Sequence, residues 1–232
     1  MSSNSFASLP LSAETLANLQ SLEYTVMTPI QAQSLPAILA GQDVLAQAKT
    51  GSGKTVAFAL GLLHSLDPRS GQTQALVLCP TRELAEQVSN EVRRLARALP
   101  NTKLTTLCGG KPMAAQLGSL AHAPHIVVGT PGRILAHLEK GSLDLGEIRT
   151  LVLDEADRML DMGFYDDIMQ IIGMTPAQRQ TLLFSATYPD EIQYISASVQ
   201  REPLDVRIET AHENRKIEQI FYEINKGERS TT

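Results

Sequence analysis

One segment of eight residues has the residue types and spacing of a phosphate-binding loop. The segment lies between an apolar run and a helix-like run, and it reads Ala48-Lys49-Thr50-Gly51-Ser52-Gly53-Lys54-Thr55. Its glycines let successive backbone N–H groups point at a polyphosphate, and the following helix presents its positive N-terminal end. The pattern G-x-x-x-x-G-K-[ST] predicts that Lys54 reaches the β- and γ-phosphates and that the Thr55 hydroxyl binds Mg²⁺. Ala48 replaces the first glycine of that pattern and is small enough to keep the strand exit tight, so we interpret the whole segment as nucleotide-binding rather than as an ordinary turn.

Carboxylates follow another apolar run, which covers residues 151–153. Asp154, Glu155 and Asp157 begin where this run ends, and open α/β sheets bind ligands at that edge. Acids after a strand are by themselves typical of a solvated helix N-terminus. Together with a phosphate loop, they predict metal-assisted hydrolysis. Asp154 is then expected to hold Mg²⁺ through its water shell, and Glu155 to orient and deprotonate the water that attacks the γ-phosphate, which makes Lys54, Asp154 and Glu155 the expected catalytic residues.

The elements that must position these residues follow from the order of apolar and amphipathic runs. From residue 43 onward, apolar runs of strand length alternate with amphipathic segments of helix length, which is typical of βαβ units. The runs are rich in Val, Leu and Ile without alternation, as expected for strands that are buried on both faces. The expected strands are 44–48, 75–79, 104–108, 126–129, 151–153, 181–184 and 204–208, and the expected helices include 55–66, 82–99 and 189–199, the last with Pro189 in its first turn. The sequence therefore predicts an α/β P-loop domain with a mostly parallel central sheet of about seven strands and helices on both faces.

The composition along the chain predicts three parts. Residues 1–40 are expected to form a helical segment, with a helix over 11–22 and a second helix that Thr28 caps and Pro29 begins. Residues 41–208 are expected to be the nucleotide-binding domain. Residues 209–216 are polar and charged like a linker, and residues 217–224 alternate like a strand. We interpret residues 209–232 as a linker and the start of a second domain that this chain lacks.

The overall composition excludes some classes of protein. No apolar run approaches the roughly 18 residues of a membrane span, and the N-terminus has neither the basic nor the apolar region of a secretory signal, so we expect a cytoplasmic protein that does not contact membranes. Cys79 and Cys108 lie in apolar runs and are expected to be reduced core residues. The net charge of -5 argues against nucleic-acid binding through a basic overall charge. Any such binding must therefore depend on a local group of residues.

An ordered series of motifs resembles the DEAD-box RNA helicases. Asp154-Glu155-Ala156-Asp157 spells D-E-A-D. The other motifs, in family order, are Tyr24-Thr25-Val26-Met27-Thr28-Pro29-Ile30-Gln31 (the Q motif, with Glu23 where the family has glycine), Pro80-Thr81-Arg82-Glu83-Leu84-Ala85, Gly109-Gly110, Thr130-Pro131-Gly132-Arg133 and Ser185-Ala186-Thr187. The resemblance spans about residues 6–207. It implies the first of two RecA-like domains of an enzyme that hydrolyses ATP with Mg²⁺ and separates short RNA duplexes.

The resemblance also implies roles for residues outside the phosphate loop. It assigns Gln31 to adenine, whose N7 and N6 amino group match the donor and acceptor of an amide, and Tyr24 to stacking on the base. It assigns a surface that holds one RNA strand by its sugar-phosphate backbone, made of Pro80, Thr81, Arg82, Gly109, Gly110, Thr130, Gly132 and Arg133. Asp157 is expected to hydrogen-bond the turn that carries Ser185 and Thr187, which would couple the nucleotide state to the RNA surface.

The motifs leave the outcome of ATP binding open. A helicase and an ATP-gated RNA clamp or scaffold that never unwinds share every motif in this domain, whereas a DNA translocase or another P-loop ATPase is disfavoured by the RNA motifs. Segments 79–85, 93–97 and 99–103 are most similar to a bacterial member directed to large-subunit ribosomal RNA, which implies ribosomal RNA as partner and a role in ribosome assembly. The family's H-R-x-G-R segment belongs to the second domain. The present chain is therefore expected to bind nucleotide but to be nearly inactive in hydrolysis and not to unwind RNA. We expect it to be a monomer.

Three other groups of residues are interpreted as structural. His122 and His125 do not predict a metal site, because Pro124 breaks the helical spacing and no thiol or carboxylate cluster accompanies them. Met159 and Met162 are expected to be packing residues. The basic run 93–97 is expected to be spread around a solvated helix face.

Overall fold

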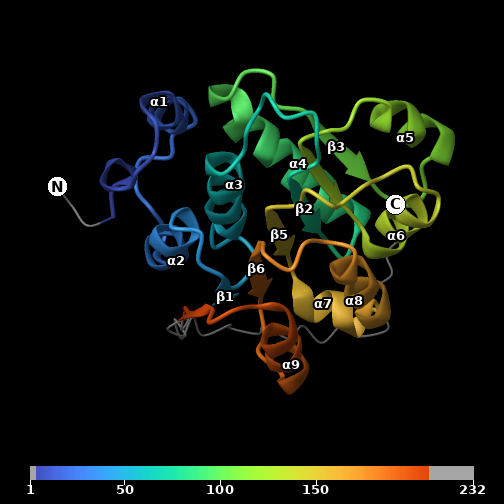
Figure 1. Cartoon of the computed structure of the whole chain (residues 1–232). Helices are drawn as coiled ribbons and strands as arrows, with labels where there is room; N and C mark the ends of the chain where they lie inside the picture. The colour runs from blue at the N-terminus through green and yellow to red at the C-terminus, as the bar shows by residue number, and fades with distance from the viewer. Residues whose placement is uncertain (1–3, 209–232) are drawn as a thin grey trace, which may run out of the picture.

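The computed structural model describes residues 4–208, which form a sheet covered by helices on both faces (Figure 1). The strand order is β3-β4-β2-β5-β6-β1-β7, and each pair of neighbours is parallel. The strands are β1 (Val44–Gln47), β2 (Ala75–Leu78), β3 (Leu104–Leu107), β4 (Ile126–Gly129), β5 (Thr150–Leu153), β6 (Gln180–Ser185) and β7 (Leu204–Arg207). The predicted α/β sheet of seven strands is confirmed, with strand ends that differ by one residue at some positions. Ser185, expected in a turn, belongs to β6 because it pairs with Gln47.

The helices alternate with the strands, and several begin at capping side chains. Thr81 accepts a hydrogen bond from Leu84 N at 3.3 Å where α4 begins, and Pro29 is the first residue of α2, as expected. The helices are α1 (Ala13–Ser21), α2 (Pro29–Leu39), α3 (Lys54–His64), α4 (Arg82–Leu95), α5 (Met113–Leu120), α6 (Pro131–Glu139), α7 (Ala156–Asp161), α8 (Tyr165–Gly173) and α9 (Asp190–Val199), with 3-10 turns at Phe6–Ser8 and Ala96–Ala98.

Two helix ends differ from the prediction. The expected helix 82–99 is α-helical only to Leu95 and then tightens into the 3-10 turn Ala96–Ala98, immediately before Leu99 and Pro100. The residue before a proline is disfavoured in the α region, which accounts for the early end. Pro189 precedes α9 as its cap, with extended backbone, rather than lying in the first turn.

The core consists of two layers on opposite faces of the sheet. Alternate residues of β2 separate between them: Ala75 and Val77 pack with α2, α3 and α4, whereas Leu76 and Leu78 pack with α6, α8 and α9. Strands buried on both faces are the expected consequence of a parallel sheet. None of the described helices combines the length and apolar composition of a membrane span.

The N-terminal helices are anchored to the first layer. A Cβ atom on Gly61 of α3 would lie 2.1 Å from Ile38 Cγ2, so the glycine allows α2 and α3 to pack closely. Gln180 Nε2 donates to Ile38 O and Gln42 O, both at 2.8 Å, and thereby fixes the end of α2 to β6.

The parallel topology gathers the motif segments at one edge. Residues that follow β1 to β6 all leave the carboxyl edge of the sheet, where α/β folds bind ligands. The expected linker and second-domain strand at 209–232 lie outside the described residues, as do residues 1–3.

Candidate functional site

A cleft of about 530 Å³ lies at the ends of β1 and β5. It is lined by most of the residues predicted to bind nucleotide: Tyr24, Gln31, Thr50, Gly51, Gly53, Lys54, Thr55, Asp154 and Glu155. Ala48, Lys49 and Ser52 lie outside this lining: Ala48 is buried and donates its backbone N–H to Ser185 O at 3.0 Å, and the Lys49 side chain is exposed. The phosphate loop and the acidic turn therefore share one cleft, as the sequence predicts.

The conformation of the loop requires glycine at two positions. Gly51 has φ +82° and Gly53 has φ +96°, in the left-handed region that side chains disfavour. A Cβ on Gly53 would also lie 2.5 Å from Gln31 Nε2, whereas a Cβ on Gly51 would meet nothing within 4 Å. Gly53 therefore serves both the backbone turn and a close approach of the Gln31 side chain.

Gln31 connects the N-terminal segment to the phosphate loop. Its Nε2 donates to Gly53 O at 3.0 Å, and its Oε1 accepts from the backbone N–H of Thr28 at 2.9 Å. The sequence did not anticipate the contact with Gly53, because it pairs the Q segment with a loop 22 residues away. The bond from Thr28 is a local one, across three residues at the start of α2. The amide retains one further N–H and one oxygen lone pair, so its expected role in reading adenine stays a prediction.

Lys54 and Asp154 each carry a buried polar atom that has no hydrogen-bond partner among the described residues. Lys54 is 6% exposed and Asp154 is 2% exposed, yet Lys54 Nζ and Asp154 Oδ1 make no hydrogen bond within the described part of the chain. Burial raises the pKa of Asp154 from 3.8 to about 6, and the nearby Lys54 only partly opposes this effect. An unpaired buried ammonium and carboxylate are costly unless a ligand completes them.

The donor set fits Mg²⁺ bound with phosphates. Magnesium keeps several waters and is typically held by one or two carboxylates together with substrate phosphate oxygens. Thr55 and Asp154, both in the cleft lining, supply a hydroxyl and a carboxylate of this kind. Within residues 4–208, no group of three or more His, Cys, Asp or Glu side chains forms a complete protein cage for a metal.

Glu155 is held in a strained position at the mouth of the cleft. Its backbone lies in the left-handed region, with φ 52° and ψ 53°, where non-glycine residues are uncommon. Thr50 Oγ1 donates to Glu155 Oε1 at 3.1 Å, and Arg158 Nη1 lies 3.4 Å from Glu155 Oε2. The sequence analysis did not find Arg158, although its i,i+3 spacing from Glu155 on a helix was a usable signal.

Tyr24 is fixed at the other end of the cleft. Its hydroxyl donates to Glu91 Oε1 at 2.7 Å, and Arg94 Nη1 pairs with Glu91 Oε2 at 2.9 Å. Burial, followed by the bond to Glu91, raises the pKa of Tyr24 to about 12. Glu23, at the position of the family's glycine, has φ +64°, so it adopts the turn conformation that glycine favours.

One face of α4 lines the cleft and was missed. Leu84, Gln87, Val88 and Glu91 follow i, i+3, i+4, i+7 spacing, which places them on one side of the helix. The spacing was visible in the sequence, but which face meets the nucleotide cleft depends on how α4 packs.

A second depression, of about 380 Å³, contains most of the predicted RNA residues. It is lined by Pro80, Thr81, Arg82, Glu83, Gly109, Gly110, Thr130, Met162 and Phe164. Gly132 and Arg133 are not part of this lining. Gly132 is exposed in the first turn of α6, and Arg133 Nη1 donates to Lys111 O and Gln116 Oε1, both at 3.1 Å.

Two residues of the depression, Met162 and Arg82, differ from or add to what the sequence predicts. Met162 is 49% exposed, so the expected packing role is wrong for Met162 and right for the fully buried Met159. Met162 follows α7 as its cap, where the helix has turned away from the core. Arg82 lies against Gly110, because a Cβ there would be 2.6 Å from Arg82 Nη1.

The expected contact between Asp157 and the turn after β6 is present. The backbone N–H and the hydroxyl of Thr187 donate to Asp157 Oδ2 at 2.9 and 2.8 Å. Partial burial by itself raises the pKa of Asp157, but the hydrogen bonds from Thr187 outweigh it and the pKa is lowered overall. The buried Ser185 Oγ has no partner among the described residues.

His125, which was predicted to be structural rather than a metal ligand, is held by hydrogen bonds at both ring nitrogens. Its Nδ1 accepts from Lys103 N at 2.9 Å, which leaves Nε2 to donate to Ser70 O at 2.8 Å. Both ring nitrogens are thus used in the fold.

Comparisons with known proteins agree with this site. A family model described as DEAD/DEAH box helicase matches residues 28–195. The chain is 63% identical to the ATP-dependent RNA helicase DbpA of Escherichia coli (strain K12) over 208 residues, which are 90% of this chain and 46% of that protein. It is 41% identical to the DEAD-box ATP-dependent RNA helicase CshA of Geobacillus kaustophilus over 222 residues, 95% of this chain and 47% of the relative. The chain thus spans a little under half the length of these relatives.

A solved structure shows the same fold. The crystal structure of a DEAD box protein from the hyperthermophile Methanococcus jannaschii matches with a TM-score of 0.84 and 38% identity, covering 88% of this chain and 56% of that one. The fold is therefore the α/β RecA-like fold, as expected. With its ordered motifs, its match to the family model and its similarity to these helicases, the chain belongs to the DEAD/DEAH box helicase family.

Proposed function

We propose that this chain binds ATP with Mg²⁺ in the cleft and provides the N-terminal, ATP-binding half of an RNA-stimulated ATPase that separates short RNA duplexes. The observation that carries the proposal is the pair of buried atoms Lys54 Nζ and Asp154 Oδ1, which have no partner in the described part of the chain and lie in a cleft that the glycine-rich loop also lines. A polyphosphate with a divalent cation complements both charges at once.

The residues of the cleft divide the chemistry among them. Backbone N–H groups of the phosphate loop and Lys54 bind the phosphates, and Thr55 and Asp154 would hold Mg²⁺. When bound there, Mg²⁺ would supply positive charge that offsets the charge on the phosphate oxygens. Glu155 positions the attacking water and accepts its proton, and its carboxylate is already oriented by Thr50 and Arg158. At the base end, Tyr24 stacks on adenine and Gln31 hydrogen-bonds its edge.

The depression that holds Arg82 and Gly110 binds one RNA strand. Its glycines permit close approach of the backbone to phosphates, and Thr81, Thr130 and Arg82 add hydroxyl groups and positive charge. Gly132 and Arg133 extend this surface at the start of α6. Such contacts address the sugar-phosphate backbone, so we expect little sequence preference from this domain.

The hydrogen bond between Asp157 and Thr187 couples the two sites in this proposal. Asp157 lies three residues after the metal ligand Asp154, and Thr187 follows β6 at the same edge. A change at the nucleotide is thereby transmitted to the turn that contains Ser185 and Thr187.

The partners and location are proposed on the sequence resemblance given above. Segments 79–85, 93–97 and 99–103 favour ribosomal RNA of the large subunit as the partner and ribosome assembly as the role. We further propose that the protein acts as a monomer in the cytoplasm, together with a second RecA-like domain.

Nucleotide binding by the chain tests the first part. A fluorescent ATP analogue should bind in the presence of Mg²⁺, and Lys54→Ala or Asp154→Ala should lower its affinity at least tenfold, since each removes a charged contact of roughly 1.5–3 kcal/mol. Arg69→Ala, which alters an exposed ion pair before β2 on the opposite edge of the sheet, is the matched control. Wild-type affinity in both cleft variants would contradict the proposal.

Strand displacement tests the second part. The chain joined to its second domain should separate a short RNA duplex with ATP and should not separate the matching DNA duplex. ATP-dependent retention of RNA without any strand separation would instead support the alternative function of an RNA clamp or scaffold.

A further inference from the structure

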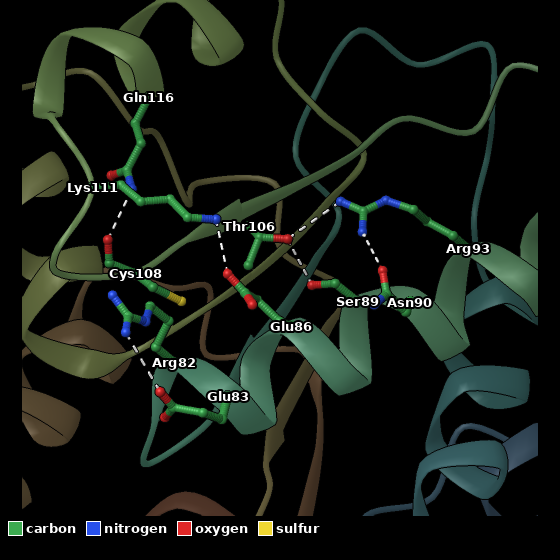
Figure 2. Close-up of polar contacts among 10 residues, drawn as sticks. All are labelled: Arg82, Glu83, Glu86, Ser89, Asn90, Arg93, Thr106, Cys108, Lys111 and Gln116. Atoms are coloured by element: carbon green, nitrogen blue, oxygen red, sulfur yellow. Dashed lines mark hydrogen bonds and ion pairs between the residues drawn. The ribbon is translucent and has the colours of Figure 1, made fainter.

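A polar groove of about 470 Å³ lies between α4, the edge strand β3 and α5, and the proposed function does not use it. Figure 2 shows several of its side chains, which come from α4, from β3, from the loop after Gly110 and from α5. The groove is lined by cations, hydroxyls and amides, including Asn90, Arg93, Thr105, Thr106 and Lys111, and by one carboxylate, Glu86.

Arg93 places an uncompensated positive charge in this groove. Its guanidinium donates to Thr106 Oγ1 at 3.3 Å and to Asn90 Oδ1 at 3.2 Å, and Thr106 in turn donates to Ser89 at 2.7 Å (Figure 2). These partners are neutral, and no carboxylate of residues 4–208 forms an ion pair with Arg93. The side chain is therefore held in place without losing its charge, and at least two of its five N–H donors remain for a ligand.

The only acidic group in the lining of this groove is already neutralised. Lys111 Nζ pairs with Glu86 Oε1 at 2.8 Å across the groove. The ammonium group keeps two further N–H donors, because one is used by Glu86. The groove therefore presents net positive charge to an incoming anion.

The groove continues from the RNA depression. Arg82, Glu86 and Arg93 lie on one face of α4, since their spacings of four and seven residues return to the same side of a helix. Arg82 lies against Gly110 in the depression, and Lys111 is the next residue. From Arg82 to Arg93 the helix rises about 16 Å, so this face extends the depression along the flank of the sheet.

The charge along the sequence agrees with a local site for an anion. Residues 82–111 contain six basic and three acidic residues, although the whole chain carries a net charge of -5. Within the basic run, Arg94 turns to the other side of α4 and pairs with Glu91 beside the nucleotide cleft, which leaves Arg93 to the groove. The helix therefore distributes the basic run 93–97 over different sides, as expected, but Arg93 faces the groove rather than open solvent.

We propose that a single RNA strand bound in the depression continues past Gly110 into this groove, where Arg93 and Lys111 bind backbone phosphates. Hydroxyl and amide groups of Thr105 and Asn90 line the same path and are of the kind that bind ribose. This inference rests on the proposed RNA function and adds a binding segment to it.

The test compares single-stranded RNAs of increasing length on the full chain at low salt, with a non-hydrolysable ATP analogue present. Wild-type affinity should rise once the RNA is long enough to leave the depression. Arg93→Ala should leave the affinity for short RNA unchanged and lower that for long RNA about tenfold. It should also reduce the slope of log Kobs against log salt for long RNA by about 0.7, the value for one lost phosphate contact on a single strand.

A second variant and a control sharpen the result. Glu86→Gln removes the carboxylate from the groove and frees Lys111, so it should raise the affinity for long RNA. Arg69→Ala, on the opposite edge of the sheet, should change neither. Equal losses on short and long RNA, or no loss on either, in Arg93→Ala would overturn the extension while the RNA function stands. A chain that binds no single-stranded RNA would overturn both.

Discussion

At the scale of single residues, the cleft departs from what stability alone would select. Lys54 Nζ and Asp154 Oδ1 are buried without hydrogen-bond partners in residues 4–208, and Glu155 occupies a left-handed backbone conformation. Each of these features costs stability unless something compensates for it, and such departures concentrate at functional sites. The free protein should therefore become more stable when one of these buried charged groups is made neutral, although its function is lost.

Asp154 provides a test of this trade-off through pH. Its pKa rises from 3.8 to about 6 on folding, so between these values the folded chain binds more protons than the unfolded chain. The free energy of unfolding must then fall as pH rises through this window and stay lower above it. We expect Asp154→Asn to be more stable than wild type by about 2–3 kcal/mol near pH 7.5, and the difference to vanish only as the pH falls below the unfolded value of 3.8. Urea unfolding in buffer without nucleotide or Mg²⁺ measures this, and a variant that is less stable near pH 7.5 would refute it.

Alanine substitutions at Gly51 and Gly53 distinguish the cost of backbone strain from the cost of a collision with the Gln31 side chain. Both have positive φ, so alanine at either position costs roughly 1–2 kcal/mol. Only at Gly53 would the new Cβ also collide with Gln31. Gly53→Ala should therefore lower stability and nucleotide affinity more than Gly51→Ala does. In a double-mutant cycle, Gln31→Ala should remove part of the extra loss, and strict additivity of Gly53→Ala and Gln31→Ala would contradict the contact.

The residues that sequence reasoning found and missed differ in how local their signals are. Lys54, Thr55, Asp154 and Glu155 belong to short motifs next to strands, so their common cleft follows once the sheet is parallel. The bond from Tyr24 to Glu91 joins residues 67 apart in the sequence. No local pattern indicates such a pair, because it depends on how the segment between α1 and α2 packs against α4.

At the scale of elements, strands were predicted more accurately than helix ends. The apolar runs fixed each strand to within a residue, because burial on both faces leaves little freedom in composition. The end of α4 depends on competition between helical periodicity and the following Pro100, and periodicity alone extends the helix too far. A boundary that one signal determines, such as the burial of a strand, is thus easier to predict than a boundary that two competing signals determine, such as the end of α4.

The link between α7 and the end of β6 is testable at this scale. Thr187→Val keeps the shape of the side chain and the backbone N–H bond, but it removes the hydroxyl that donates to Asp157. We expect a loss of about 0.5–1 kcal/mol in the free energy of unfolding, and a pKa of Asp157 that moves back towards its ordinary value. Because a lowered carboxyl pKa stabilises the fold above the unfolded value near 3.8 and less as pH falls, the loss should shrink in acid.

The same variant also tests coupling when the second domain is present. ATP hydrolysis should persist while strand displacement declines, and Thr187→Ser, which keeps the hydroxyl, should behave like wild type. Parallel losses of both activities in Thr187→Val would count against a coupling role.

At the scale of the whole molecule, the nucleotide cleft at the carboxyl edge of the sheet and the groove along the edge strand β3 have opposite electrostatic character. The nucleotide cleft is lined by Glu91, Asp154 and Glu155 with one buried lysine, whereas the groove along β3 is basic. The net charge of -5 therefore hides a local basic surface, which is why composition alone gave no direct sign of the proposed RNA binding. The sequence resemblance supplied that sign through backbone-binding motifs instead.

The composition of the cleft also predicts what the isolated chain does with ATP. No arginine is among the residues that line the cleft in the described part of the chain, and Arg158 is engaged by Glu155. Phosphoryl transfer in related nucleotidases gains about 10³ to 10⁵ in rate from an arginine that stabilises charge in the transition state. The chain should accordingly bind ATP yet show negligible RNA-stimulated phosphate release, with Glu155→Gln as the background control. Joining the second domain should restore stimulation, because the missing positive charge would then reach the γ-phosphate. Robust stimulation of the isolated chain by RNA would mean that its own residues already complete the site.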